Sequence, residues 1–279
     1  MLTEAQIDEF RNQGFLIVPG FVDNEVVDSM KRRGQAIVDE CQPKDVSVFS
    51  TKNQASKTDK YFLNSANNVS IFFEEGAFGE DGTLLKPKAY CINKIGHALH
   101  DLVPEFREWS RGQKVQSILK SLGYEHPTPV QSMYIFKQPR IGGEVVPHQD
   151  GTFLATVPQS VVGFWIALED ATIENGCLWG LPKSHINGIY RRFVRSPEGA
   201  VSFHGSMPNF ELKEFVPLEV KKGDLVLLHG ANVHCSKENT SDASRHAFSV
   251  HFVEGGSNVD WEKNNWLQRA SDFPFKPVY

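Results

Sequence analysis

Residues 129–150 read PVQSMYIFKQPRIGGEVVPHQD and contain two strand-like runs, 129–138 and 143–150, on either side of a turn with proline and glycine. Four further runs of this kind follow, separated by Gly, Pro, Asp and Asn: SVVGFWIALED, GCLWGLPKSH, FVPLEVKKGDLVLLHG and RHAFSVHFVE. Many short strands at this spacing are typical of a β-sandwich or a barrel-like jelly roll. We therefore predict a jelly-roll core over about residues 128–255.

The residues before this core have a largely helical pattern. Thr3 and Gln6 have the spacing of a capping box, and Gly14 suits the end of that helix. Hydrophobic spacing predicts further segments: helices over 23–41, 93–110 and 112–124, strands at 15–21 and within 69–87, and a polar loop over 42–60. We expect one domain over 1–279, of the α+β class and mainly β, in which the helices of about 1–127 flank the jelly roll.

The composition is that of an ordinary soluble globular protein, with 40% hydrophobic and 23% charged residues. A net charge of −5 without a long basic stripe argues against nucleic acid as a partner. No apolar run approaches the roughly 20 residues that span a membrane, and the acidic, helical N-terminus differs from a signal peptide. The cysteines form no CxxC pair, which favours reduced thiols: Cys41, Cys91, Cys177 and Cys235. We expect a cytoplasmic monomer without a membrane partner.

His148 and Asp150 raise the question of a metal site at the end of the second strand-like run. Ten His and 34 acidic residues in 279 positions give about one His-x-acid match by chance, so a polar strand end is the simpler interpretation of the pair alone. In a strand, however, residues i and i+2 share a face. Both side chains could therefore reach one ion, while Gln149 would point away.

A third ligand has four histidine candidates downstream: His229, His234, His246 and His251. Two histidines and one carboxylate leave three coordination positions open, as non-haem Fe(II) oxygenases require, two for a 2-oxo acid and one for O2. The distal carboxylate of 2-oxoglutarate then needs a buried cation, and the planar fork of arginine suits it. Arg245 lies 11 residues after His234 and opens the next strand-like run. An elbow between these strands would place both side chains in one pocket, which favours His234.

Motifs along most of the chain point to one family. They read GFLIVPGF, INKIGHALHD, VQSMYIFKQPRIGGEVVPHQDGTFL, GFWIALEDATIENGCLWGLPKSH, LVLLHGANVHCSKENTSDASRHAFSVHF and NNWLQ. Together they resemble the phytanoyl-CoA dioxygenase family of Fe(II)- and 2-oxoglutarate-dependent oxygenases. The resemblance implies a double-stranded β-helix, the cupin-type jelly roll, with iron bound by His148, Asp150 and His234. It also implies that Arg245 pairs with the 2-oxoglutarate carboxylate and that four residues contact the co-substrate: Lys94, Met133, Trp165 and Ser236.

The same resemblance implies a reaction. 2-Oxoglutarate and O2 would give succinate and CO2 while a small-molecule substrate is hydroxylated, with ascorbate as a candidate reductant.

Three arginines follow the motif GCLWGLPKSH: Arg191, Arg192 and Arg195. This cluster is either an anion-binding lip for an acid or an acyl-CoA, or a solvated surface loop. Lys183 departs from the family pattern, which often has Gly in a PGSH turn. Two alternative functions use the same residues: a non-catalytic jelly-roll binding module and a cupin-type Zn hydrolase.

Several residues have simpler interpretations when they are taken alone. Lys94 would be a solvated lysine on a helix, and Trp165 a core residue of an alternating strand. His229 and His251 are expected to satisfy internal hydrogen bonds. Two aromatic residues suit either a substrate pocket or plain packing: Phe153 and Trp179.

Overall fold

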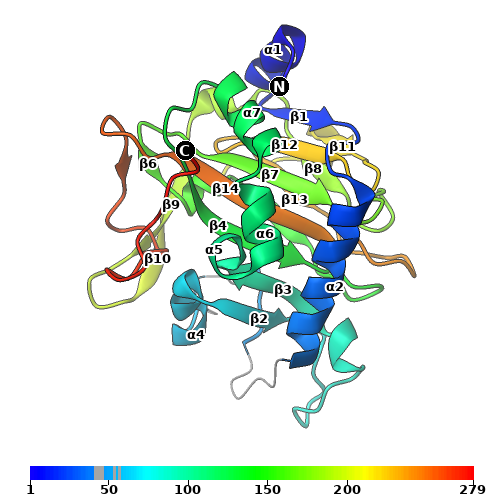
Figure 1. The fold of residues 1–279 in the computed structure, drawn as a ribbon. Helices are drawn as coiled ribbons and strands as arrows, with labels where there is room; N and C mark the ends of the chain where they lie inside the picture. The colour runs from blue at the N-terminus through cyan, green and yellow to red at the C-terminus, as the bar shows by residue number, and fades with distance from the viewer. Residues whose placement is uncertain (41–46, 53–54, 56–57) are drawn as a thin grey trace.

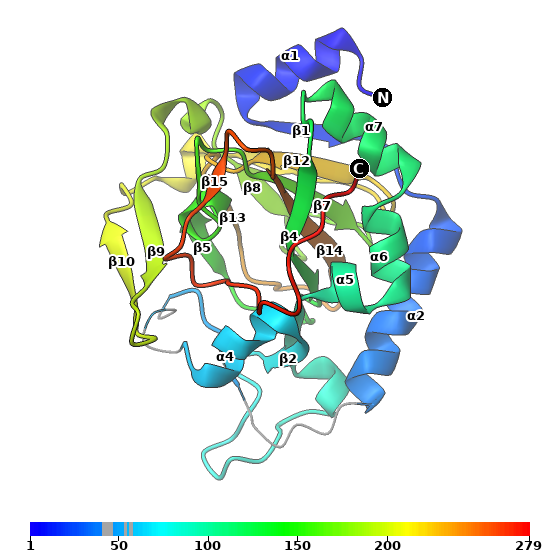
Figure 2. The same cartoon turned by 60° about the vertical axis from the view of Figure 1, so that its left-hand side comes forward.

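The computed structural model describes residues 1–40, 47–52, 55 and 58–279. A seven-stranded antiparallel sheet in the order β1-β12-β7-β14-β4-β3-β2 lies at its centre, and a four-stranded sheet in the order β11-β8-β13-β5 lies against one face of it (Figures 1 and 2). Trp165 and Val226 of the large sheet share an apolar cluster with Leu178 of the small one. The two facing sheets form the jelly roll that the strand pattern predicts.

The strands are short, as expected for this fold. The large sheet contains β1 (Phe15–Val18), β2 (Val69–Phe73), β3 (Ile92–His97), β4 (Pro127–Ile135), β7 (Val162–Ala167), β12 (Leu225–His229) and β14 (Ala247–Glu254). The small sheet contains β5 (Val145–His148), β8 (Leu178–Gly180), β11 (Val216–Leu218) and β13 (His234–Ser236). Two separate pairs are β9 (Arg191–Arg195) with β10 (Val201–Gly205), and β6 (Thr156–Val157) with β15 (Asp260–Trp261).

Helices cover the other face of the large sheet (Figure 2). They are α2 (Asn24–Glu40), α5 (Leu99–Leu102), α6 (Pro104–Ser110) and α7 (Gln113–Ser121), while α1 (Glu4–Gln13) lies beside β1 and α4 (Lys60–Asn64) near β2. Val27 and Met30 of α2 and Phe106 of α6 are buried in one cluster with Phe164 and Phe248 of the sheet. Removal of these side chains from water holds the helical layer on the sheet.

The first helix has the ends that its sequence predicts. The Thr3 hydroxyl accepts from the Gln6 backbone N–H at 3.3 Å, and the Thr3 backbone N–H donates to Gln6 Oε1 at 3.0 Å, which completes a capping box. Gly14 ends the helix with φ of 82°, a left-handed conformation, and a Cβ atom at this position would collide with the His185 ring. β1 follows directly, so α1 is fixed to the edge of the large sheet.

Two predicted segments have a different structure. The helix predicted over 93–110 is wrong at its start, because residues 92–97 form β3 and α5 begins only at Leu99. Ile92, Ile95 and Leu99 fit a helical spacing, but β3 pairs with β2 on one side and β4 on the other, so tertiary pairing decides. Residues 191–195 are likewise a strand rather than a loop, since they pair with β10.

Some predictions concern residues outside the described ranges. Much of the polar loop predicted over 42–60 lies there, as does Cys41. Within the described part, Val48 forms a bridge with Phe73, and three cysteines are buried without a disulfide: Cys91, Cys177 and Cys235. No helix within the described ranges is both long enough and apolar enough to cross a membrane.

Candidate active site

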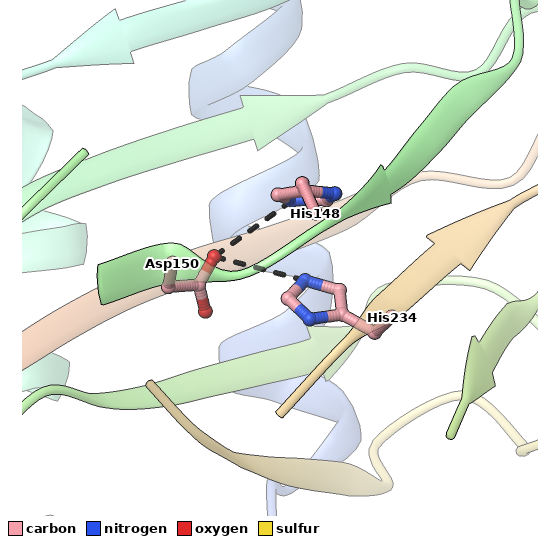
Figure 3. A group of neighbouring side chains, drawn as sticks. All are labelled: His148, Asp150 and His234. Carbon is pink, nitrogen blue, oxygen red and sulfur yellow. Dashed lines mark ion pairs between the residues drawn. The ribbon is translucent and has the colours of Figure 1, made fainter. Parts of the chain in front are cut away.

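Three side chains from adjacent segments form a group that can hold a metal ion (Figure 3). His148 ends β5, Asp150 begins a short 3-10 turn, and His234 begins β13. β5 and β13 pair antiparallel with His234 opposite His148, so strand pairing brings the two rings together. The ligating atoms all lie within 4.8 Å of one another. Asp150 Oδ1 is 3.8 Å from His148 Nε2 and 3.6 Å from His234 Nε2.

Contacts on the outer side of the group fix how its members face the centre. His148 Nδ1 donates to the carbonyl of Val146 at 2.9 Å, and His234 Nδ1 donates to the carbonyl of Asn232 at 3.2 Å. Because a carbonyl can only accept, each ring presents the lone pair of Nε2 to the centre. Asp150 Oδ2 lies 3.1 Å from Nε2 of His251, which leaves Oδ1 for an ion.

The charge states of the group suit a metal cation. Burial, together with the neighbouring His234, lowers the pKa of His148 to about 3. Burial alone would raise the pKa of Asp150, but His251 and His234 hold this pKa below its ordinary value. At neutral pH His148 is therefore a neutral imidazole and Asp150 a carboxylate, the forms that bind metals.

The large sheet forms one wall of a cavity of about 1250 Å³, open mouth included, into which the group opens. Trp165 on β7, Ser249 on β14 and Met133 on β4 are direct partners across three adjacent strands. Arg245, just before β14, is 1% exposed, with its guanidinium 5.1 Å from the centre of the Trp165 ring. Its Nε donates to the carbonyl of Gly176 at 3.0 Å, whereas Nη1 has no partner among the described residues. This wall thus carries a buried cation with an unused donor.

Lys94 is a second buried basic side chain of the same wall. It lies on β3 and is 5% exposed, with Nζ 3.1 Å from the centre of the Phe49 ring and 3.8 Å from Met133 Sδ. Burial lowers the pKa of Lys94 well below its ordinary value, although the Glu74 charge opposes the shift. The interpretation of Lys94 as a solvated helical lysine is therefore wrong, because β3 turns this side chain into the cavity.

Ser236, two residues after His234 on β13, lines the same cavity. Its Oγ accepts from Lys137 Nζ at 2.8 Å, and the same Nζ donates to the carbonyl of Gly143 at 2.7 Å. Lys137 is 2% exposed, and burial together with Arg245 lowers its pKa to about 7. A protonated amine has no lone pair, so the Ser236 hydroxyl keeps its own proton for another acceptor.

The structure brings all the predicted site residues to this one cavity: Lys94, Met133, His148, Asp150, Trp165, His234, Ser236 and Arg245. Phe153 and Arg191 line it too, whereas Trp179 does not. His229 lies elsewhere and accepts from the Ala231 N–H at 3.1 Å, as expected for an internal hydrogen bond. Lys183 is exposed with φ of 62°, a left-handed conformation that explains a family preference for Gly at this turn.

Sequence reasoning missed the roles of two residues at this site, His251 and Lys137. His251 was expected only to satisfy internal hydrogen bonds, yet it contacts Asp150. Strand alternation gave a usable signal, because residues 245, 247, 249 and 251 share one face. Lys137 gave no such signal, since it follows β4 with φ of 43°, outside the regular strand.

Comparison with known proteins identifies the family. Residues 10–247 match the family model described as phytanoyl-CoA dioxygenase. The chain is 49% identical over 269 residues to the Arabidopsis thaliana protein named phytanoyl-CoA dioxygenase, which covers 96% of this chain and 94% of that relative. It is 46% identical over 291 residues to phytanoyl-CoA dioxygenase domain-containing protein 1 of Bos taurus, covering 100% of this chain and 99% of the relative.

Solved structures show a similar fold at low sequence identity. The non-heme alpha-ketoglutarate-dependent carbocyclase SnoK from nogalamycin biosynthesis matches with a TM-score of 0.65 and 18% identity, over 99% of this chain and 96% of that one. EvdO2 from Micromonospora carbonacea, complexed with 2-oxoglutarate, matches with a TM-score of 0.59 and 18% identity, over 96% and 98%. The family match and the relatives show that the chain belongs to the phytanoyl-CoA dioxygenase family.

Proposed function

We propose that the protein is an Fe(II)- and 2-oxoglutarate-dependent dioxygenase. It would convert 2-oxoglutarate and O2 to succinate and CO2 and hydroxylate a small-molecule substrate. One observation carries the proposal: a group of two histidines and one carboxylate shares a cavity with an arginine that has no acidic partner among the described residues. When bound, iron supplies the O2 activation and C–H oxidation that side chains cannot perform.

The donor set fits iron. His148, Asp150 and His234 direct two imidazole lone pairs and one carboxylate oxygen toward a common centre, and they would bind the ion from one side. Three protein ligands would leave coordination positions of the ion for other ligands. Imidazole and carboxylate ligands without a thiolate suit a non-haem iron site. His251 would hold the outer oxygen of Asp150, so that the carboxylate binds through Oδ1.

The co-substrate would lie against the large sheet. 2-Oxoglutarate carries two negative charges, and this wall offers the guanidinium of Arg245 and the amine of Lys94. The guanidinium fork of Arg245 would take the distal carboxylate bidentately. Ser236 would donate its hydroxyl proton to the same carboxylate, because Lys137 already donates to its Oγ. Trp165 and Met133 would cover the carbon chain.

A second, smaller set of expectations accompanies the proposal. The prime substrate would enter through the open side of the cavity, and an anionic acid or an acyl-CoA is the expected class. A monomeric state, a cytoplasmic location and ascorbate as reductant also stay predictions. Size-exclusion chromatography, fractionation of cells and omission of ascorbate from the assay test them in turn.

Release of labelled CO2 from 1-labelled 2-oxoglutarate tests the proposal. The wild-type protein with Fe(II) should release CO2 slowly without a second substrate and faster with a metabolite extract that contains one. His234→Ala should release none, while His229→Ala serves as the matched control, because His229 lies outside the cavity. Binding of 2-oxoglutarate without CO2 would instead identify a binding module. A Zn hydrolase would show neither.

A further inference from the structure

Arg191 is a cation that enters the cavity from β9 rather than from either sheet. Its guanidinium carbon lies 4.1 Å from the centre of the Phe203 ring on β10. Its Nε is buried without a hydrogen-bond partner, and no carboxylate pairs with it in the part of the chain that the structure describes. A guanidinium that is partly removed from water and left without a counter-charge is costly, unless a ligand supplies the anion.

The other two arginines of β9 have different surroundings. Arg192 also has an Nε without a partner among the described residues, but its Nη1 lies 4.0 Å from Glu262 Oε1 and its Nη2 donates to Asn264 Oδ1 at 3.3 Å, so this cation already has an acidic partner. Arg195 ends the strand, and neither it nor Arg192 lines the cavity. Of the three arginines, only Arg191 is both directed at the cavity and free to bind an anion.

Gln149 fixes the position of Arg191 relative to the metal centre. It lies between the ligands His148 and Asp150, with its side chain turned away from them. Its Nε2 donates to the carbonyl of Gly188 at 2.7 Å, and its Oε1 accepts from the backbone N–H of Tyr190 at 2.9 Å. The chain entering β9 is therefore tied to the residue between two proposed ligands, so Arg191 is held at a defined place.

Ring contacts connect the metal group to Arg191: Phe153, which lines the cavity, lies next to His148, and Phe203 lies next to both Phe153 and Arg191. The Phe153 ring is 6.3 Å from the His148 ring and 6.1 Å from the Phe203 ring, on which the Arg191 guanidinium rests. An anion at Arg191 would therefore be separated from the metal by an apolar surface. A molecule that reaches both must have an apolar body between its anionic end and its reacting carbon.

We propose that Arg191 binds an oxyanion of the prime substrate, and that this substrate is an amphipathic acid oxidised at a carbon remote from the anion. The apolar body would lie on Phe153, which lines the cavity. The proposal rests on the proposed function, because the metal centre determines which carbon reacts. A carboxylate and a phosphate monoester share the chemistry that the guanidinium fork recognises.

Paramagnetic relaxation tests this arrangement with octanoate, octyl phosphate and octanol as probes. Each is titrated into protein that carries Mn(II) and 2-oxoglutarate, for the wild type, Arg191→Met and the matched control Arg195→Met. At least one of the two anions should bind the wild type and Arg195→Met alike, and bind Arg191→Met about 10- to 100-fold more weakly. Its terminal methyl protons should relax faster than the protons beside the anion. Comparison of the two anions identifies which oxyanion is preferred.

The proposal is overturned if neither anion binds the wild type more tightly than octanol does, if both variants lose equal affinity, or if the protons beside the anion relax fastest. Calorimetric titration of the same anions into metal-free wild type, Arg191→Met and Arg195→Met measures their affinities without the metal. It therefore tests the Arg191 contact independently of the metal centre. CO2 release from 2-oxoglutarate without any probe should be equal in the control Arg195→Met and the wild type, because Arg195 does not line the cavity. If neither protein releases CO2, the proposed function is refuted. The calorimetric titration would still decide whether Arg191 binds the anion.

Discussion

The two walls of the cavity are built in different ways. The wall of the large sheet carries Lys94 and Arg245, at 5% and 1% exposure, on or beside strands that pair on both sides. The wall that carries Arg191 is a two-stranded pair outside both sheets (Figure 2), and Arg191 is only half-buried there. The basic side chains proposed for the shared co-substrate thus lie on the rigid core, and the cation proposed for the variable substrate lies on an appendage.

This difference indicates where specificity for the prime substrate can change while binding of the co-substrate is kept. A site on a buried sheet is held in place by the packing of the whole domain, whereas a peripheral segment tolerates substitution. Substitutions in the large-sheet wall should therefore impair 2-oxoglutarate binding for every substrate. Substitutions in β9–β10 should alter only the prime substrate.

The largest effect is expected at the metal centre, where both walls meet. Replacement of His148, Asp150 or His234 by Ala should abolish CO2 release and sharply weaken Mn(II) binding, measured by electron paramagnetic resonance, because each removes one of three ligands. His229→Ala is the control and should behave as the wild type. Normal turnover in His234→Ala, with loss in His229→Ala, would show that the third ligand has been assigned wrongly.

Arg245→Ala should have the next largest effect. Removal of one partner from a buried charge pair typically costs about 3–5 kcal/mol, and roughly 1.4 kcal/mol corresponds to a tenfold change. The affinity for 2-oxoglutarate should fall about 10²- to 10³-fold in a titration with Mn(II) present, while Mn(II) affinity is kept. Arg245→Lys should recover little, since an ammonium cannot form the fork. A fall of less than about threefold would place the carboxylate anchor elsewhere.

His251→Phe should weaken metal binding about 10- to 100-fold, as is typical when an outer contact of a metal ligand is lost. The ring keeps its approximate volume but can no longer hold Asp150 Oδ2, which lies 3.1 Å from Nε2 in the wild type. Ser249→Ala, on the same face of β14, is the matched control and should leave Mn(II) affinity unchanged. Equal Mn(II) affinities in His251→Phe and the wild type would return His251 to a packing role.

Lys137→Met should weaken 2-oxoglutarate binding about tenfold, because the hydroxyl of Ser236 loses the donor that orients it. In a Ser236→Ala background the same change should have little further effect, and full additivity would contradict the coupling.

Burial and Arg245 lower the pKa of Lys137 to about 7, with Glu74, Glu144 and Cys235 opposing. The ammonium is lost as the pH rises through that value, so wild-type affinity should fall above about pH 7. Lys137→Met should lack this fall.

The smallest effect is expected at Lys183, in the connection from β8 to the β9–β10 wall. Its φ of 62° is unfavourable for a residue with a side chain. Lys183→Gly should therefore raise the free energy of unfolding by about 1 kcal/mol, which for a chain of this size is a melting shift of roughly 2 °C. Because Lys183 does not line the cavity, the kinetics should stay the same. A change in 2-oxoglutarate affinity would show that this turn does shape the site.

Strand alternation and spacing predicted the metal group and Arg245 without the structure, whereas the family resemblance supplied Lys94, Met133, Trp165 and Ser236. Alternation placed His148 and Asp150 on one face with Gln149 turned away, and the elbow between two strands selected His234. Lys94 could not be placed this way, since Ile92, Ile95 and Leu99 fit a helix and only pairing with β2 and β4 makes the segment a strand. Residues 191–195 contain three arginines and were interpreted as a loop or lip, but pairing with β10 makes them a strand. In each failure, contacts remote in sequence outweigh the local pattern.

Visible absorption under anaerobic conditions tests the central claim most directly, because chelation of Fe(II) by a 2-oxo acid produces a metal-to-ligand charge-transfer band. Addition of 2-oxoglutarate to the Fe(II)-loaded wild type should produce this band. The band should be absent in His234→Ala and should require about 10²- to 10³-fold more 2-oxoglutarate in Arg245→Ala. A wild type that gives no band, or an unchanged band in His234→Ala, would contradict the proposal that iron and 2-oxoglutarate meet at this site.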